Sequence, residues 1–152
     1  MPYVVLAVST ALFFFYLQTV CERVLRREFS HSHLRDVIAA IHLEYPRLRE
    51  GAAANASLQY SETRLALECD FVALRYLLKS SDRARRRLSR SEKGLMLYFR
   101  VLLFSLSIRH ALKLRQKDSV LKLTTILQYF ANVLGERVRV NSLDAAFSDL
   151  QS

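Results

Sequence analysis

The sequence predicts an all-α protein, in which a single N-terminal transmembrane helix precedes a compact bundle of about four to five helices. Three observations carry this prediction. The segment from Pro2 to Cys21 contains no Asp, Glu, Lys, Arg or His. The chain has only 3 glycines and 2 prolines, so few residues oppose helix formation. Beyond the uncharged segment, apolar residues recur at helical spacing.

The uncharged segment is long enough for one membrane crossing. A helix rises about 1.5 Å per residue, so about twenty residues cross a hydrocarbon core of roughly 30 Å. Tyr3 is expected at one interface, and a bulky aromatic group is expected to face lipid within the span: Phe13, Phe14, Phe15 and Tyr16. A cleaved signal peptide is the competing interpretation, but it would carry its basic residues before the apolar run.

Three arginines follow this segment directly and predict its orientation. Arg23, Arg26 and Arg27 come after the apolar run, and only Met1 precedes it. The positive-inside rule therefore predicts that the N-terminus lies outside and the following domain in the cytoplasm. The expected organisation is an anchor over residues 1–22 and a cytoplasmic helical domain over residues 23–152.

After the anchor, the pattern predicts a helix that Pro46 ends or kinks and that Gly51 closes, because proline disrupts a helix interior and glycine often terminates a helix. Residues 51–57 are then expected to form a connection or a frayed turn. The apolar stripe that predicts this helix recurs at offsets of three and four: Leu34, Val37, Ile38, Ile41, Tyr45 and Leu48.

The next predicted helix covers about residues 57–80 and carries two neighbouring apolar stripes. Two stripes together predict a wide buried arc and a central position, with Cys69 as a small core residue. One stripe is Leu65, Cys69, Val72 and Tyr76, and the other is Leu67, Phe71, Leu74 and Leu78.

The C-terminal half predicts three more helices. Ser89 and Glu92 have the spacing of a capping box, which marks a helix start before a core helix from Leu95 to Ile108. A further helix is expected to begin at Asp118 or Ser119 and to end at Gly135. Residues 138–140 would be extended or form a turn, and Asn141 would cap a short last helix.

The most biased stretch runs from Lys79 to Lys93 and carries five of the nine net positive charges. Four interpretations stay open for it: a solvated linker, a site for anionic lipid, a contact with an acidic protein face, or a nucleic-acid site. Nucleic acid is disfavoured because no aromatic residues interleave the charges. The expected binding residues are Arg83, Arg85, Arg86, Arg87 and Arg90.

No catalytic, cofactor-binding or metal-binding motif emerges from the sequence. Hydrolase, phosphate-loop, dinucleotide and zinc-protease signatures are absent, and the two cysteines, Cys21 and Cys69, form no metal motif. We therefore expect no enzyme and no cofactor. The sequence favours a single-pass accessory, assembly or scaffolding subunit that docks on other membrane-complex subunits. The alternative is a membrane-tethered module whose arginines bind anionic lipid or nucleic acid.

Overall fold

The structure, a computed structural model, describes residues 1–26, 42–54, 59–80, 89–114 and 116–149, with side chains of the last range described to residue 139. Every regular element in this part of the chain is an α-helix, which confirms the all-α prediction. The helices are α1 (Pro2–Leu25), α3 (Tyr45–Ala53), α4 (Tyr60–Ser80), α5 (Arg90–Ala111) and α6 (Lys117–Asp149). The predicted stripe from Leu34 to Ile41 lies outside the described residues.

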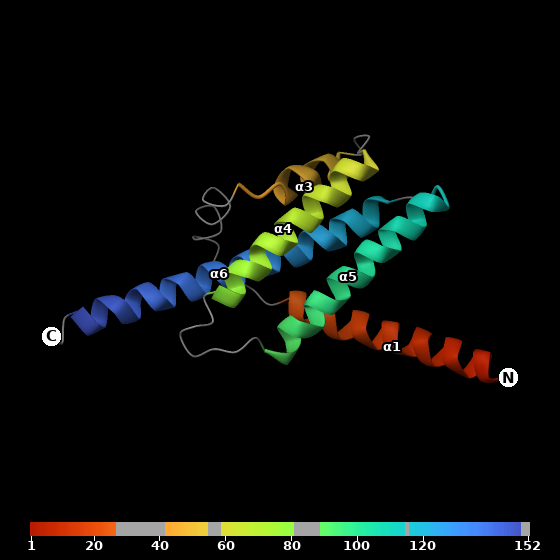
Figure 1. Ribbon diagram of the computed structural model, residues 1–152, viewed down its shortest axis with the longest axis horizontal. Coiled ribbons are helices and arrows are strands. Elements are labelled where there is room, and N and C mark those ends of the chain that lie inside the picture. Colours follow the sequence, from red (N-terminus) through yellow and green to blue (C-terminus); the bar gives the residue numbers. More distant parts are fainter. Residues whose placement is uncertain (27–41, 55–58, 81–88, 115, 150–152) are drawn as a thin grey trace.

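Helix α6 is the centre of the bundle, because α3, α4 and α5 all pack against it (Figure 1). Its core residues Leu123, Ile126 and Leu127 are completely buried. The ring of Phe71 from α4 stacks on Phe99 from α5, with 4.3 Å between centroids, and meets Phe130 of α6 edge-on at 6.3 Å. Three helices therefore share one aromatic and aliphatic core.

Helix α1 is divided between a free part and a docked part. Its residues from Pro2 to Tyr16 are exposed, whereas Leu17 and Cys21 are buried where the last turns pack against α5 and α6. The free part projects from the bundle (Figure 1). The predicted boundary at residue 22 falls inside this continuous helix.

Helix α3 corrects the predicted role of Pro46 and Gly51. The chain starts a helix at Tyr45 with Pro46 in its first turn, where the missing amide hydrogen of proline costs nothing. Gly51 lies inside that helix, so residues 51–53 are helical rather than a connection. Before it, His42 has a positive φ of 52°, which shows that the chain turns there instead of continuing in a helix.

Helix α6 corrects the predicted break near Gly135. The helix is continuous from Lys117 to Asp149, so residues 138–140 are helical and Asn141 caps no separate helix. Gly135 is buried. Glycine costs roughly 1 kcal/mol in a helix interior, and the helix nevertheless continues through this position.

The start of α5 confirms the predicted capping box. The Ser89 hydroxyl accepts a hydrogen bond from the Glu92 amide at 3.2 Å, and a Glu92 carboxylate oxygen accepts one from the Ser89 amide at 2.9 Å. The same carboxylate also binds Arg137 of α6, at 2.8 and 2.9 Å from its two oxygens. Glu92 thus fixes both the start of α5 and its position against α6.

Candidate docking surfaces

The aromatic residues predicted to face lipid are all on the free part of α1. Tyr3, Phe13, Phe14, Phe15 and Tyr16 are exposed. Helix α1 is the one described helix that is long and apolar enough to cross a membrane, with 24 residues and a mean hydropathy of 2.0 in its most apolar window. A signal sequence or the core helix of a soluble protein has the same length and composition.

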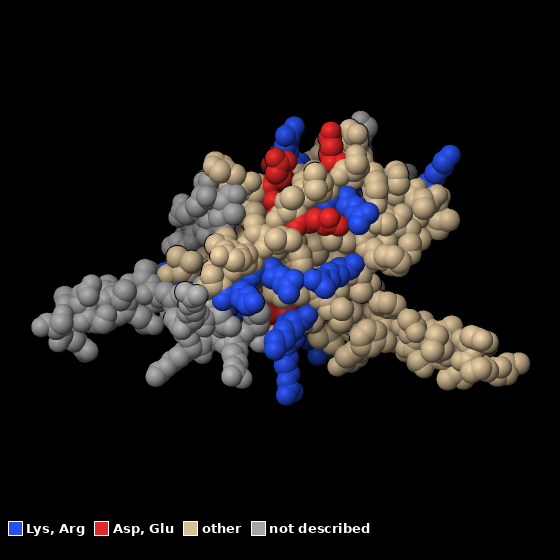
Figure 2. All heavy atoms as spheres, in the orientation of Figure 1, with Lys and Arg blue, Asp and Glu red and all other residues tan. Residues whose placement is uncertain are grey.

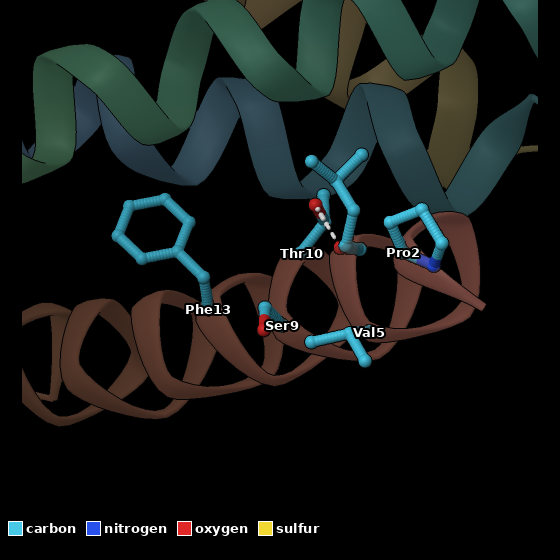
Figure 3. Close-up of a pocket in the computed structure, with 6 residues that line it drawn as sticks. Pro2, Val5, Ser9, Thr10 and Phe13 are labelled. Atoms are coloured by element: carbon cyan, nitrogen blue, oxygen red, sulfur yellow. Dashed lines mark hydrogen bonds between the residues drawn. The ribbon is translucent and has the colours of Figure 1, made fainter.

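A shallow groove runs along this free part (Figure 3). All of its lining comes from α1 itself, and the Thr10 hydroxyl donates a hydrogen bond to the Leu6 carbonyl at 2.7 Å instead of pointing a polar group into the groove. The lining is almost wholly apolar and uncharged: Pro2, Val5, Leu6, Ser9, Thr10 and Phe13. Such a surface suits acyl chains better than a polar ligand, which needs convergent polar groups.

The docked end of α1 has one polar contact with α6 in addition to its packing. Lys122 of α6 approaches the Glu22 carboxylate at 4.0 Å, and within α1 Gln18 donates a hydrogen bond to the same carboxylate at 3.0 Å. Burial against this end raises the pKa of Tyr98 on α5, and the Glu22 charge acts in the same direction. The basic residues Arg23 and Arg26 are exposed beside this junction, while Arg27 lies outside the described residues.

One of the two predicted core stripes of α4 is exposed, which corrects the prediction of a wide buried arc. Leu67, Phe71, Leu74 and Leu78 are buried, but Leu65, Val72 and Tyr76 are 61%, 63% and 70% exposed. Cys69 is exposed as well, so it is not a core residue. We call Leu65, Cys69, Val72 and Tyr76 the α4 stripe. Their spacing of four, three and four residues is that of a helix seam that packs against another helix.

Helix α5 also presents an outer face, which corrects the prediction that it is a core helix on all sides. The face is basic at its N-terminal end and apolar at its C-terminal end. Its exposed side chains recur every three or four residues and include no carboxylate: Arg90, Lys93, Leu97, Arg100, Phe104 and Ile108. We call these six residues the α5 outer face. The corner that follows exposes Leu112, Lys113 and Leu114.

Positive charge gathers near the start of α5. On the face shown in Figure 2, lysine and arginine atoms gather around the end of α4 and the beginning of α5, whereas most acidic atoms lie over α3 and the first part of α4. Of the predicted binding arginines, Arg90 is exposed at the first position of α5. The other four, Arg83, Arg85, Arg86 and Arg87, lie outside the described residues.

A chain of polar groups links α4 to α5. The Tyr60 hydroxyl donates to Ser107 Oγ at 2.9 Å, Ser107 donates to the Leu103 carbonyl, and Arg64 donates to the Tyr60 hydroxyl at 3.4 Å. The Tyr60 ring stacks on His110 with 3.9 Å between centroids. These groups lie at the surface between α4 and α5, and their contacts join the two helices.

Asp70 is a buried acidic residue whose role was not visible in the sequence. Its Oδ2 accepts hydrogen bonds from the amides of Glu44 and Tyr45, at 2.9 and 2.7 Å, and so caps the N-terminus of α3 from a neighbouring helix. Burial raises the pKa of Asp70, and the two amide hydrogen bonds oppose part of that shift. Burial and the nearby Asp70 charge also raise the pKa of Tyr45 to about 12.

Within the described part of the chain, no three His, Cys, Asp or Glu residues lie close enough together to hold a metal ion. Asp70 and Glu92 both have structural partners. Comparisons with protein families, curated proteins and solved structures return no match to this chain. The features that remain for interaction are therefore the free part of α1, the α4 stripe, the α5 outer face and the basic region beside them.

Proposed function

We propose that this chain is a non-catalytic, single-pass membrane protein that serves as an accessory or assembly subunit of a larger membrane protein complex. Helix α1 anchors it with the N-terminus outside, and the helical bundle docks on other subunits at the cytoplasmic face. The main support is the α4 stripe, because an exposed apolar row on a helix whose opposite side is already packed favours a protein contact.

The contact expected for the α4 stripe is an apolar helix of another subunit. The three large side chains have the spacing found where two helices pack along their length. A second helix can therefore receive them between its own side chains. The residues beside them on α4 include the ion pair of Arg64 and Glu68, 3.1 Å apart, which gives the stripe a polar margin. An apolar centre with a polar margin is the usual composition of a protein interface.

Co-purification from native membranes in mild detergent tests this proposal. The full-length chain is compared with a stripe variant, Leu65→Ser, Val72→Ser and Tyr76→Ser. A matched control replaces three exposed charged residues of the same helix, Glu62, Arg75 and Lys79, with serine. We expect the same partner subunits with the original chain and the control, and their loss with the stripe variant.

Recovery of the original chain as a free monomer would rule out the subunit proposal. The alternative, a tethered module that binds anionic lipid or nucleic acid through its arginines, would then be favoured. It predicts that the protein binds anionic vesicles or DNA in low salt, and that binding is lost in high salt and on replacement of Arg85, Arg86 and Arg87 by alanine.

A further inference from the structure

The uncharged segment from Pro2 to Cys21 extends past the point where α1 meets the bundle, so a span formed by this segment brings the bundle into contact with lipid. This argument rests on the proposed membrane span. The exposed turns from Pro2 to Tyr16 extend about 22 Å, at 1.5 Å per residue, against a hydrocarbon core of roughly 30 Å. Bundle packing begins at Leu17. The surface around the docked end must therefore lie at the level of the lipid headgroups and the outermost acyl chains.

The part of the bundle beside this junction is α5. The α5 residue Tyr98 is buried next to the docked end of α1, which places the middle of α5 at the junction. From there the two helices diverge, and the N-terminal half of α1 and the C-terminal half of α5 extend toward the same side of the molecule (Figure 1). The C-terminal half of α5 thus leans in the direction in which α1 enters the membrane.

The chemistry of the α5 outer face matches this position. Arg90, Lys93 and Arg100 are in its N-terminal half, and Phe104 and Ile108 follow toward the membrane side. Basic side chains reach lipid phosphates and large apolar side chains reach acyl chains, so a face that is basic at one end and apolar at the other suits the boundary between headgroups and acyl chains. At the corner, the long side chain of Lys113 can extend back to the headgroups while Leu112 and Leu114 remain in apolar surroundings.

We propose that the α5 outer face lies in the interfacial layer of the leaflet that receives the docked end of α1. Phe104 and Ile108 contact acyl chains, and Arg90, Lys93 and Arg100 contact the phosphates of anionic lipid. The bundle is then attached to the membrane at two places, and its orientation on the membrane is fixed. The α4 stripe, on another helix of the bundle, remains available to a protein partner.

Single tryptophans in the full-length protein test this arrangement, because the chain contains no tryptophan of its own. Phe104→Trp reports on the α5 outer face, with Ile108→Trp as a second probe. Tyr76→Trp on the α4 stripe is the matched control, since Tyr76 and Phe104 are 70% and 69% exposed. Phe14→Trp reports on the span itself. Each variant is reconstituted into phosphatidylcholine and phosphatidylglycerol vesicles with or without bromine on the acyl chains.

We expect bromine to reduce the emission of Phe104→Trp, Ile108→Trp and Phe14→Trp, and to leave that of Tyr76→Trp unchanged. Aqueous iodide should quench only the Tyr76 variant. If bromine quenches the Phe14 probe but neither α5 probe, the interfacial position is wrong while the span stands. If it fails to quench the Phe14 probe, the proposed span itself is wrong. Shielding of both α5 probes from iodide without bromine quenching would mean that protein covers this face, which also overturns the proposal.

Discussion

At the scale of single residues, Asp70 shows how one buried carboxylate positions a helix. Its oxygen receives two backbone amides at the start of α3, although it belongs to α4. A helix N-terminus has backbone amide groups without partners, so a side-chain oxygen that accepts their hydrogen bonds is favourable there. The sequence showed only an acidic residue among apolar ones, because a cap supplied from 25 residues away has no local pattern.

Two substitutions of Asp70 distinguish the effect of its hydrogen bonds on stability from the effect of its charge. Asp70→Ala should lower the free energy of unfolding by about 1 to 3 kcal/mol, because two amides lose their acceptor. Asp70→Asn is the matched control: its side-chain oxygen can accept both hydrogen bonds, so we expect a much smaller change. Thermal unfolding of the detergent-solubilised protein, followed by circular dichroism, measures both. An equal loss of unfolding free energy in the two variants would mean that the charge of Asp70, and not its hydrogen bonds to α3, stabilises the protein.

The raised pKa of Asp70 also predicts a pH dependence. Because the carboxyl group is harder to ionise in the folded protein, its ionisation favours unfolding. Its contribution to stability is complete below the unfolded-state pKa and is lost as pH rises through the folded-state pKa. The stability of the original protein relative to Asp70→Asn should therefore increase on acidification from neutral pH. A constant difference across the same titration would contradict this.

At the scale of helices, the contact between α5 and α6 depends on Glu92. The side chains of Glu92 and Arg137 are only 9% and 14% exposed, and the Arg137 Nη1 atom is buried without a hydrogen-bond partner among the described residues. The Ser89 side of the capping box was readable from the sequence because its pattern is local. The Arg137 side was not, because it joins residues 45 positions apart.

Removing Arg137 should cost more than removing the cap. Arg137→Ala leaves the Glu92 charge buried without its cation and should lower the free energy of unfolding by about 3 kcal/mol or more. Ser89→Ala should cost about 1 kcal/mol, and Glu136→Ala, which removes an exposed charge on the next residue, should change little. Chemical denaturation of the three variants gives the comparison. A loss for Arg137→Ala no larger than for Glu136→Ala would contradict the structural role of the pair.

The wrong predictions of helix ends and buried sides share one cause. The same local sequence pattern is compatible with two different structures. Proline disrupts a helix interior but fits a first turn, so Pro46 could end a helix or start one. Gly135 could end α6 or provide close packing within it. Leu65 and Leu67 are equally apolar, and only the positions of α3 and α6 decide that Leu67 faces the core and Leu65 faces outward. Local sequence identifies helices well, but tertiary packing decides their ends and their buried sides.

At the scale of the whole molecule, charged and apolar residues occupy different parts of the surface. The free helix is uncharged, basic residues lie beside its docked end, and acidic and basic residues mix over α3 and the first part of α4 (Figure 2). The composition and the uncharged segment predicted the helical class and the candidate anchor. The two exposed faces of α4 and α5 could not be predicted, because apolar helical stripes usually mark the core.

The two native cysteines provide a test of the proposed orientation. Cys69 is exposed on α4, and Cys21 is buried. If the bundle lies in the cytoplasm, a membrane-impermeant maleimide should label Cys69 only after the cells are permeabilised. Cys69→Ser should remove the labelling, which confirms that Cys21 does not react. Labelling of Cys69 in intact cells that express the chain alone would place the bundle outside.

The cap on α3 also bears on the order in which the bundle assembles. Helix α3 has 9 residues, fewer than the roughly 12 to 15 that an isolated helix needs in water. Its capping oxygen becomes available only when α4 is in place. We therefore expect α3 to form last and to open first, as a separate cooperative unit. Native-state hydrogen exchange should show the α3 amides exchanging earlier than those of α4, with Asp70→Ala widening the difference, so that one edge of the bundle can unfold while the rest stays folded.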